Sequence, residues 1–296
     1  MKKVLLTVLI LALCAVPVLF TACSNVSQRD LLTTGYVCSD DGYEYFSYDV
    51  YHKDGEQKTL VGEMTMTFEP KKAVDVTLPS ATEEAGQKTF ASFSGTLLSI
   101  DVTMTNGDSI LSRVIYSSSC APTFSYKKTV IGGVEKVMQV SYEGKYLYAK
   151  RFENGKEAAS LRYKAASCLD NESLYALVRA SSVGNSSYSF SYKCVNPLTM
   201  NADGMTISRV GSSDETIDVL TPTDYTLPEG KEKYTTPTYV FRIQTDNQYA
   251  SSYTMEITQK SVTVKNDVID VKNVKKVITS ITEGDYSYVL KDIKIV

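Results

Sequence analysis

The chain has 296 residues, of which 43% are hydrophobic and 22% are charged, with 31 Lys and Arg against 34 Asp and Glu. Loss of the leader described below removes Lys2 and Lys3, which leaves 29 basic against 34 acidic residues and a net charge of −5. This sign argues against a nucleic-acid partner and against electrostatic attachment to anionic lipid. The 21 Tyr and the many Thr, Ser and Val fit pleated surfaces, so β-structure should dominate.

The N-terminus has the pattern of a secretory signal. Lys2-Lys3 precedes an uncharged apolar stretch, Val4–Phe20, which ends at Thr21-Ala22-Cys23. Small residues leading directly to a cysteine resemble the bacterial lipobox, although Phe20 stands where Leu is usual. The resemblance implies cleavage before Cys23 and a diacylglycerol on its sulfur.

The alternative is an uncleaved signal anchor. The apolar stretch is at the lower limit of about 17 residues for a membrane-spanning helix, and Pro17 interrupts it. We therefore predict a signal peptide over 1–22, a lipid anchor on Cys23 and a polar tether over 23–42. Two acyl chains hold a protein firmly on a membrane. The chain should be a cell-envelope lipoprotein, with its domain facing the periplasm or the cell exterior.

Cysteine usage leaves two interpretations open. Cys14 leaves with the leader and Cys23 carries lipid, so the remaining cysteines are Cys38, Cys120, Cys168 and Cys194. An even number in an exported protein predicts two disulfides, with three alternative pairings. The alternative is four free, buried thiols. The wide spacing and the absence of a nearby His argue against a zinc or redox site.

Turn signals recur at short intervals along the body of the chain. Residues that tolerate positive φ are what tight hairpin turns require. They are Asp54-Gly55, Asn106-Gly107, Gly132-Gly133, Glu143-Gly144, Asn154-Gly155 and Glu283-Gly284. Strand-like runs flank each of them, for example Ile100 to Thr105 and Ser109 to Tyr116. This pattern predicts an antiparallel meander.

Alternation indicates which face of a strand is buried. Tyr239, Phe241 and Ile243 share one face of their segment, and Tyr253 to Thr258 repeats the pattern. The two segments should form a hairpin that turns through Asp246-Asn247-Gln248.

One segment departs from the β pattern. Asp170-Asn171-Glu172 offers a cap and acidic charge for a first helical turn, and Leu174, Leu177 and Val178 follow at helical spacing. We predict a short helix over Asp170–Ala180. The fold class is thus mainly β, an antiparallel meander forming a curved sheet or open half-barrel with one short helix. Residues 43–296 form one domain or two β halves joined near 170–180.

Three short motifs resemble the bacterial domain of unknown function 3108. They are Tyr48-Asp49-Val50-Tyr51, Ala121-Pro122, and Asp170-x-x-Ser173-Leu174-Tyr175-x-x-x-Arg179. The similarity runs from Tyr43 to the C-terminus and implies an exported, antiparallel β protein with no assigned activity. In shape class the predicted fold is also similar to the half-barrel lipoprotein carriers, whose curved sheet shelters an acyl chain.

Few residues are candidates for chemistry. The single histidine, His52, should lie at a hairpin tip, and it suggests neither a metal cluster nor a catalytic triad. The acidic pairs Asp40-Asp41, Glu83-Glu84 and Asp214-Glu215 are typical of solvated loops. Asp170, Ser173 and Arg179 carry the family resemblance. Their structural interpretation is that Asp170 caps the helix and Arg179 complements its dipole or pairs with a sheet carboxylate; the functional one places them at a ligand mouth.

Tyrosines cluster in two regions and could stack on sugars or line an apolar groove. They are Tyr43, Tyr45, Tyr48 and Tyr51, and then Tyr142, Tyr146 and Tyr148. Ordinary packing is the alternative.

The main functional hypothesis is a non-catalytic envelope lipoprotein that binds a lipid or other apolar or amphipathic ligand in its concave face, without a cofactor. A second is a structural or interaction protein that binds an envelope protein or a surface glycan. A third, an extracytoplasmic hydrolase, requires facing carboxylates in a cleft with a strongly shifted pKa.

Overall fold

The computed structural model describes residues 43–180, 189–196, 199–218, 233–245, 254–264 and 272–295. The predicted leader, Cys23, the tether, Cys38 and Asp40-Asp41 lie outside these residues. No helix among the described residues is long and apolar enough to cross a membrane.

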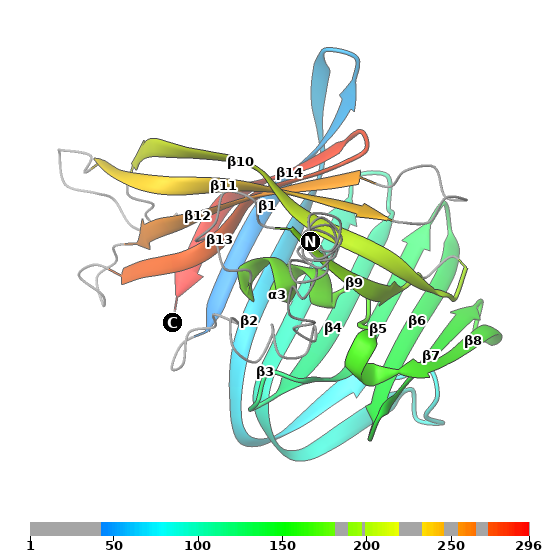
Figure 1. Cartoon of the computed structure of the whole chain (residues 1–296). Coiled ribbons are helices and arrows are strands. Elements are labelled where there is room, and N and C mark those ends of the chain that lie inside the picture. The colour runs from blue at the N-terminus through cyan, green and yellow to red at the C-terminus, as the bar shows by residue number, and fades with distance from the viewer. Residues whose placement is uncertain are drawn as a thin grey trace, which may run out of the picture.

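Two meanders form a single antiparallel sheet of 14 strands (Figure 1). The first contains β1 (Glu44–Asp54), β2 (Gln57–Pro79), β3 (Gln87–Met104), β4 (Ser109–Ser117), β5 (Pro122–Ile131), β6 (Val134–Glu143), β7 (Tyr146–Glu153) and β8 (Lys156–Lys164). The second contains β9 (Ser189–Val195), β10 (Ala202–Asp218), β11 (Lys233–Thr245), β12 (Thr254–Val264), β13 (Lys272–Glu283) and β14 (Tyr286–Ile295). A short 3-10 helix, η1 (Ala165–Ser167), and the helix α3 (Ser173–Ala180) connect the two meanders.

The first and last strands join the two halves. β1 pairs with β14 from Glu44 opposite Ile295 to His52 opposite Tyr286. The edge strands are β8 and β9, so the curved sheet is not closed into a barrel. A parallel bridge between Leu169 and Cys194 ties the connecting segment to β9. The predicted fold class, a curved antiparallel sheet with a short helix, is confirmed.

The predicted turns lie between consecutive strands as expected. Gly55 and Gly284, for example, adopt φ values of 61° and 57°, a region that costs glycine little and most other residues more. The β11–β12 hairpin is also confirmed, because Phe241 lies opposite Ile257 and Ile243 opposite Met255. Its turn, 246–248, lies outside the described residues.

The helix α3 fills the concave side of the sheet (Figure 1). Leu174, Leu177 and Val178 are almost fully buried and belong to the main core, together with inward side chains from both meanders such as Phe68 and Phe241. The predicted spacing of apolar residues is therefore confirmed.

A long arm of β2 and β3 covers part of the outer face. The arm bends where Ala73 and Ser92 adopt φ values of 51° and 48°. Beyond the bend, apolar side chains form a second core with outward side chains of β3 to β7; this core contains Val76, Leu78, Leu97, Ile115, Phe124, Tyr126, Val137 and Phe152. The end of the arm, in the loop between β2 and β3, is held to β6 by a hydrogen bond: Gln139 Oε1 accepts from the Ala81 amide at 2.8 Å. The arm thus covers outward side chains of β4 to β6.

Two acidic pairs differ in their surroundings. Glu83 and Glu84 are exposed in the loop between β2 and β3, as predicted. Asp214 and Glu215 are not in a loop but in β10, opposite Pro237 and Thr236 of β11. The prediction of a loop is therefore wrong at this pair. The two charged residues lie within a long strand, and the alternation of apolar and polar residues does not indicate that strand in the sequence.

Candidate ligand pocket

Asp170 and Ser173 begin α3 and form a buried network. The Ser173 amide donates to Asp170 Oδ1 at 2.9 Å, so Asp170 caps the helix, which begins at Ser173 rather than at Asp170. Asp170 Oδ2 accepts hydrogen bonds from Ser173 Oγ at 2.7 Å and Tyr142 Oη at 2.8 Å. Burial raises the pKa of Asp170, although the hydrogen bonds from Ser173 and Tyr142 oppose the shift.

Arg179 pairs with a carboxylate of the sheet, one of the two roles predicted for it. Its Nη1 lies 2.7 Å from Glu44 Oε2, and the two side chains are 1% and 5% exposed. The guanidinium also lies over the Phe68 ring, 4.4 Å from its centroid. Asp170, Ser173 and Arg179 are all buried, with Asp170 and Ser173 at the start of α3 and Arg179 near its end. Their role at a ligand mouth stays a prediction.

No disulfide joins any two of the described cysteines, Cys120, Cys168 and Cys194. Any arrangement with two disulfides requires one bridge within this trio, and the structure contains none. Their sulfurs face different partners: Cys168 Sγ lies 3.7 Å from the Leu169 carbonyl oxygen, and Cys194 Sγ lies 3.7 Å from Asn171 Oδ1. Burial raises the pKa of Cys168 to about 12.

A pocket of about 580 Å³ opens beside the inner face of β4 to β7. Its lining is a mixture of aliphatic, basic and acidic side chains; they are Ile110, Lys127, Thr129, Ile131, Val134, Lys136, Val137, Met138, Arg151 and Glu283. The strand register brings several of these residues together on one face of the sheet. Thr129 of β5, for example, lies opposite Ile110 of β4 on one side and Lys136 of β6 on the other. The pocket is large enough for a small-molecule site and has the mainly apolar walls typical of one.

The deep side of the pocket reaches the start of α3. A smaller cavity of about 90 Å³ shares Ile110, Lys127 and Glu283 with the pocket and is also lined by Glu172 and Tyr175. Since both cavities border the same three residues, they form adjoining parts of one site.

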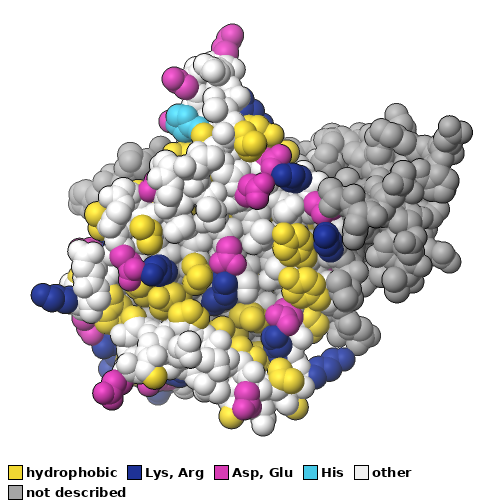
Figure 2. Space-filling view, turned by 180° about the vertical axis from the view of Figure 1, so that it is seen from behind, with side chains coloured by type: hydrophobic (Ala, Val, Ile, Leu, Met, Phe, Trp, Pro, Cys, Tyr) yellow, Lys and Arg dark blue, Asp and Glu magenta, His cyan; other side chains and the backbone are white. Residues whose placement is uncertain are grey.

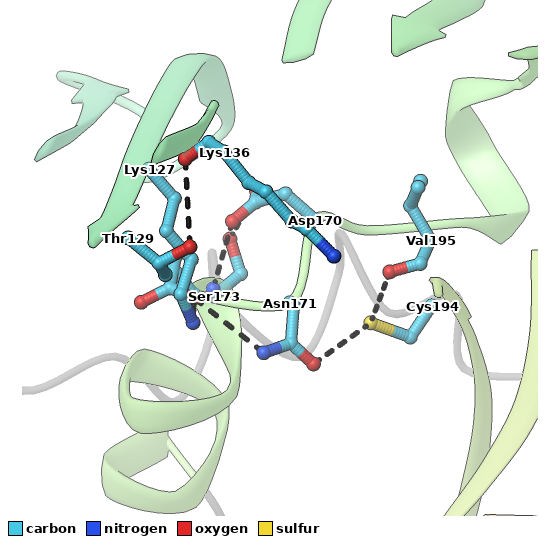
Figure 3. A network of polar contacts seen from close by, with 9 residues as sticks. Lys127, Thr129, Lys136, Asp170, Asn171, Ser173, Cys194 and Val195 are labelled. Carbon is cyan, nitrogen blue, oxygen red and sulfur yellow. Dashed lines mark hydrogen bonds and ion pairs between the residues drawn. The ribbon is translucent and has the colours of Figure 1, made fainter. Parts of the chain in front are cut away.

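An ion pair lies where this site meets the start of the helix α3. Lys127 Nζ lies 2.7 Å from Glu172 Oε1, and Asn171 Nδ2 donates to the same oxygen at 3.4 Å (Figure 3). Burial disfavours ionisation of Glu172, but Lys127 outweighs it and lowers the pKa of the carboxyl. Burial likewise opposes the charge of Lys127, and Glu172 more than offsets it, so the pKa of Lys127 is raised. Both groups are therefore charged at neutral pH.

The pocket lies at the end of the sheet away from the first described residue. Glu283 precedes the β13–β14 turn, and Tyr286 after that turn lies opposite His52 near the tip of the β1–β2 hairpin. β1 begins with Glu44 at its other end. The chain therefore enters the sheet at one end, and the pocket opens at the other.

The outer face has a different character. In Figure 2, apolar, acidic and basic side chains are interspersed, and the hairpin that carries His52 projects from the rest of the molecule. His52 packs against Tyr286 with ring centroids 5.0 Å apart, close to the predicted hairpin tip. Tyr146 and Tyr148 lie side by side, and the Arg162 guanidinium is 3.8 Å from the Tyr146 ring centroid.

Sequence reasoning missed the polar residues of the pocket. Lys127, Lys136 and Arg151 were not singled out, because lysines and arginines on alternating strands usually face water. The available signal was the apolar alternation of Phe124 and Tyr126, which places Lys127 on the opposite face of β5. Without knowledge of the β2–β3 arm, that alternation indicates the wrong face as the interior.

No group of His, Cys, Asp and Glu suited to hold a metal ion occurs within the described ranges. The two carboxylates of the site, Glu172 and Glu283, border the same small cavity. Lys127 holds Glu172 in its charged form, so Glu172 does not supply the protonated carboxyl that an acid catalyst requires.

Comparisons with known proteins give no activity for the chain. No family model matches it, so the resemblance to the domain of unknown function 3108 stays a prediction. No curated protein matches it. Among solved structures, it is similar to a beta-barrel-like protein of domain of unknown function DUF1849 from Brucella abortus, with 14% identity and a TM-score of 0.46, over 86% of this chain and 98% of that chain.

Proposed function

We propose that the protein is a non-catalytic lipoprotein of the bacterial cell envelope that binds an apolar or amphipathic ligand in the pocket at the open end of its sheet. The pocket carries this proposal, because aliphatic side chains form its walls while charged groups occupy a few positions around them. That combination suits a ligand with an apolar body and a polar end.

The anchor completes the proposal. Lipid on Cys23 would hold the domain at a membrane through the tether that precedes Glu44. Because the pocket opens at the opposite end from Glu44, it would remain accessible while the anchor is embedded. Mature protein from its native envelope should begin at Cys23 and carry acyl mass in a mass spectrum. An intact Met1 end would refute the anchor.

A tryptophan at the pocket rim tests ligand binding. The chain has no Trp, so Val134→Trp introduces a unique fluorophore at a position that is 47% exposed. Alkyl amphiphiles with bromine atoms along the chain should quench it with saturation. Thr103→Trp, at an exposed position on β3 outside the pocket lining, is the matched control and should show only collisional quenching.

A blocking variant makes the test decisive. Thr129→Trp places a large ring between Ile110 and Lys136. It should prevent a probe from binding in the pocket, so that no bound probe remains to be displaced by a ligand. Thr103→Trp should leave both binding and displacement of the probe intact. Native mass spectrometry of protein from cells should show extra mass that disappears on denaturation. Equal, linear quenching at positions 134 and 103 would refute the pocket as a ligand site.

The outer tyrosines favour a second candidate, recognition of a surface glycan. Tyr146, Tyr148 and Arg162 form a partly exposed aromatic and cationic cluster on β7 and β8. Aromatic faces of this kind stack on sugar rings. Tyr146→Ala should then abolish retention on envelope glycan, whereas an unchanged retention would exclude this candidate.

A further inference from the structure

Basic side chains outnumber acidic ones in the lining of the pocket. Lys127, Lys136 and Arg151 line it from β5, β6 and β7, and Glu283 is the acidic residue of that lining. This differs from the chain as a whole, which has more acidic than basic residues. The local charge is therefore not a consequence of composition.

The three cations differ in how far the protein neutralises them. Lys127 is 2.7 Å from Glu172, a carboxylate that is 4% exposed, so this cation is already paired. Arg151 Nε is 3.4 Å from Glu153 Oε1, a longer contact at a carboxylate that is 41% exposed. Among the described residues, no carboxylate lies within 4.0 Å of Lys136 Nζ. Lys136 is therefore available for a ligand.

The strand register brings Lys136 and Arg151 to one side of the pocket. Lys136 lies opposite Glu153, and Arg151 lies opposite Met138, so the two cations are diagonal neighbours on the same face of β6 and β7. Diagonal pairs on one face are about 7 to 8 Å apart, within reach of two long side chains. A single anionic group could contact both.

Aliphatic residues complete the complementarity. Ile110, Val134 and Met138 lie beside these cations in the same lining. Lys and Arg can extend their methylene stems along such surfaces and keep their charged ends toward water or a ligand. The pocket thus offers an apolar wall with a positively charged border.

We infer that the ligand is an amphiphile with a negatively charged headgroup, such as a carboxylate or phosphate, which Lys136 and Arg151 bind while its apolar body contacts Ile110 and Met138. This inference rests on the proposed function and specifies the class of its ligand. Glu153 and Glu283, the nearby carboxylates, should exclude a second negative charge.

Three probes of equal chain length test it: an alkyl carboxylate, the corresponding alcohol and the alkyltrimethylammonium ion, each below its micelle concentration. Binding is measured by quenching or displacement in the Val134→Trp protein. The carboxylate should bind roughly fivefold more tightly than the alcohol, as expected for a partly exposed ion pair, and the ammonium ion most weakly. Because the whole chain is acidic, nonspecific attraction would give the reverse order.

Substitutions locate the effect. Lys136→Glu should remove the preference for the carboxylate, and Lys136→Arg should retain it. Lys145→Glu, an exposed position at the turn that follows the far end of β6, makes the same charge change and should leave the preference unaltered. Added salt should weaken carboxylate binding more than alcohol binding.

The outcomes separate this inference from the proposed function. Equal saturable binding of all three probes, or a carboxylate preference that survives Lys136→Glu, would overturn the anionic headgroup while the pocket remains a ligand site. Failure of all three probes to quench Val134→Trp above the level of Thr103→Trp would overturn both.

Discussion

Replacing Glu44 by Gln should destabilise the fold strongly, because it leaves the Arg179 guanidinium charged at a site that is 1% exposed. Removing one partner of a buried ion pair costs about 3 to 5 kcal/mol. For a domain of this size, 1 kcal/mol corresponds to roughly 2 to 4 °C in Tm, so the expected decrease is about 6 to 20 °C. Urea unfolding followed by circular dichroism measures the free energy directly.

A double-mutant cycle distinguishes pairing from packing. Glu44→Gln with Arg179→Met removes both charges, and Met can occupy apolar space beside Phe68. The double variant should therefore be more stable than Glu44→Gln alone. Lys150→Met is the control, since its partner Glu157 and Lys150 itself are 43% and 42% exposed, and its cost should stay below about 1 kcal/mol. A cost for Glu44→Gln no larger than that control would refute a buried pair.

Three further perturbations test the fold and the network at the start of α3. Gly95→Ala should lower stability by several kcal/mol in urea unfolding, because a Cβ there would lie 2.0 Å from the Tyr116 carbonyl oxygen at a φ of 153°. Asp170→Asn should gain stability relative to the native chain as pH rises from the ordinary Asp pKa of 3.8 toward the raised folded value, because over that window the carboxyl of the unfolded native chain ionises while the buried carboxyl of the folded chain keeps its proton. In the folded protein a thiol reagent should modify Cys120 quickly and Cys168 only after unfolding, since burial raises the pKa of Cys168 to about 12.

Each of these has its own control. Gly211→Ala should be tolerated, because the nearest atom to its Cβ would be 3.5 Å away. If the difference in unfolding free energy between the native and Asp170→Asn proteins does not change with pH through the stated window, the raised pKa of Asp170 is refuted. Fewer than three reactive thiols in the denatured, unreduced mature chain would show that one of the described cysteines forms a disulfide.

Much of the fold was predictable because its signals are local. A tight turn such as Gly284 requires a backbone conformation that few residues adopt cheaply, so the residue itself marks the turn. The start of α3 was readable for a similar reason, since Asp170 satisfies the amide of Ser173 within a single turn. Alternation also located the inward face of β11 at Phe241.

The pocket was not predictable from such signals. Lys127 and Lys136 belong to it because the β2–β3 arm covers the opposite face of β5 and β6, and the arm is fixed by contacts such as Gln139 to Ala81, far apart in sequence. The Glu44 partner of Arg179 lies 135 positions away in the chain. No local pattern encodes a pairing of that range.

The sequence by itself determined the β class, the positions of the turns, the helix and its cap, and the expectation of a lipid on Cys23, because each depends on neighbouring residues. Only the tertiary structure decided that β1 pairs with β14, that α3 fills the concave face, and that Lys136 and Arg151 share an apolar pocket at one end. These features arise from the curvature of one sheet, which brings distant strands together and depends on all of its pairings at once.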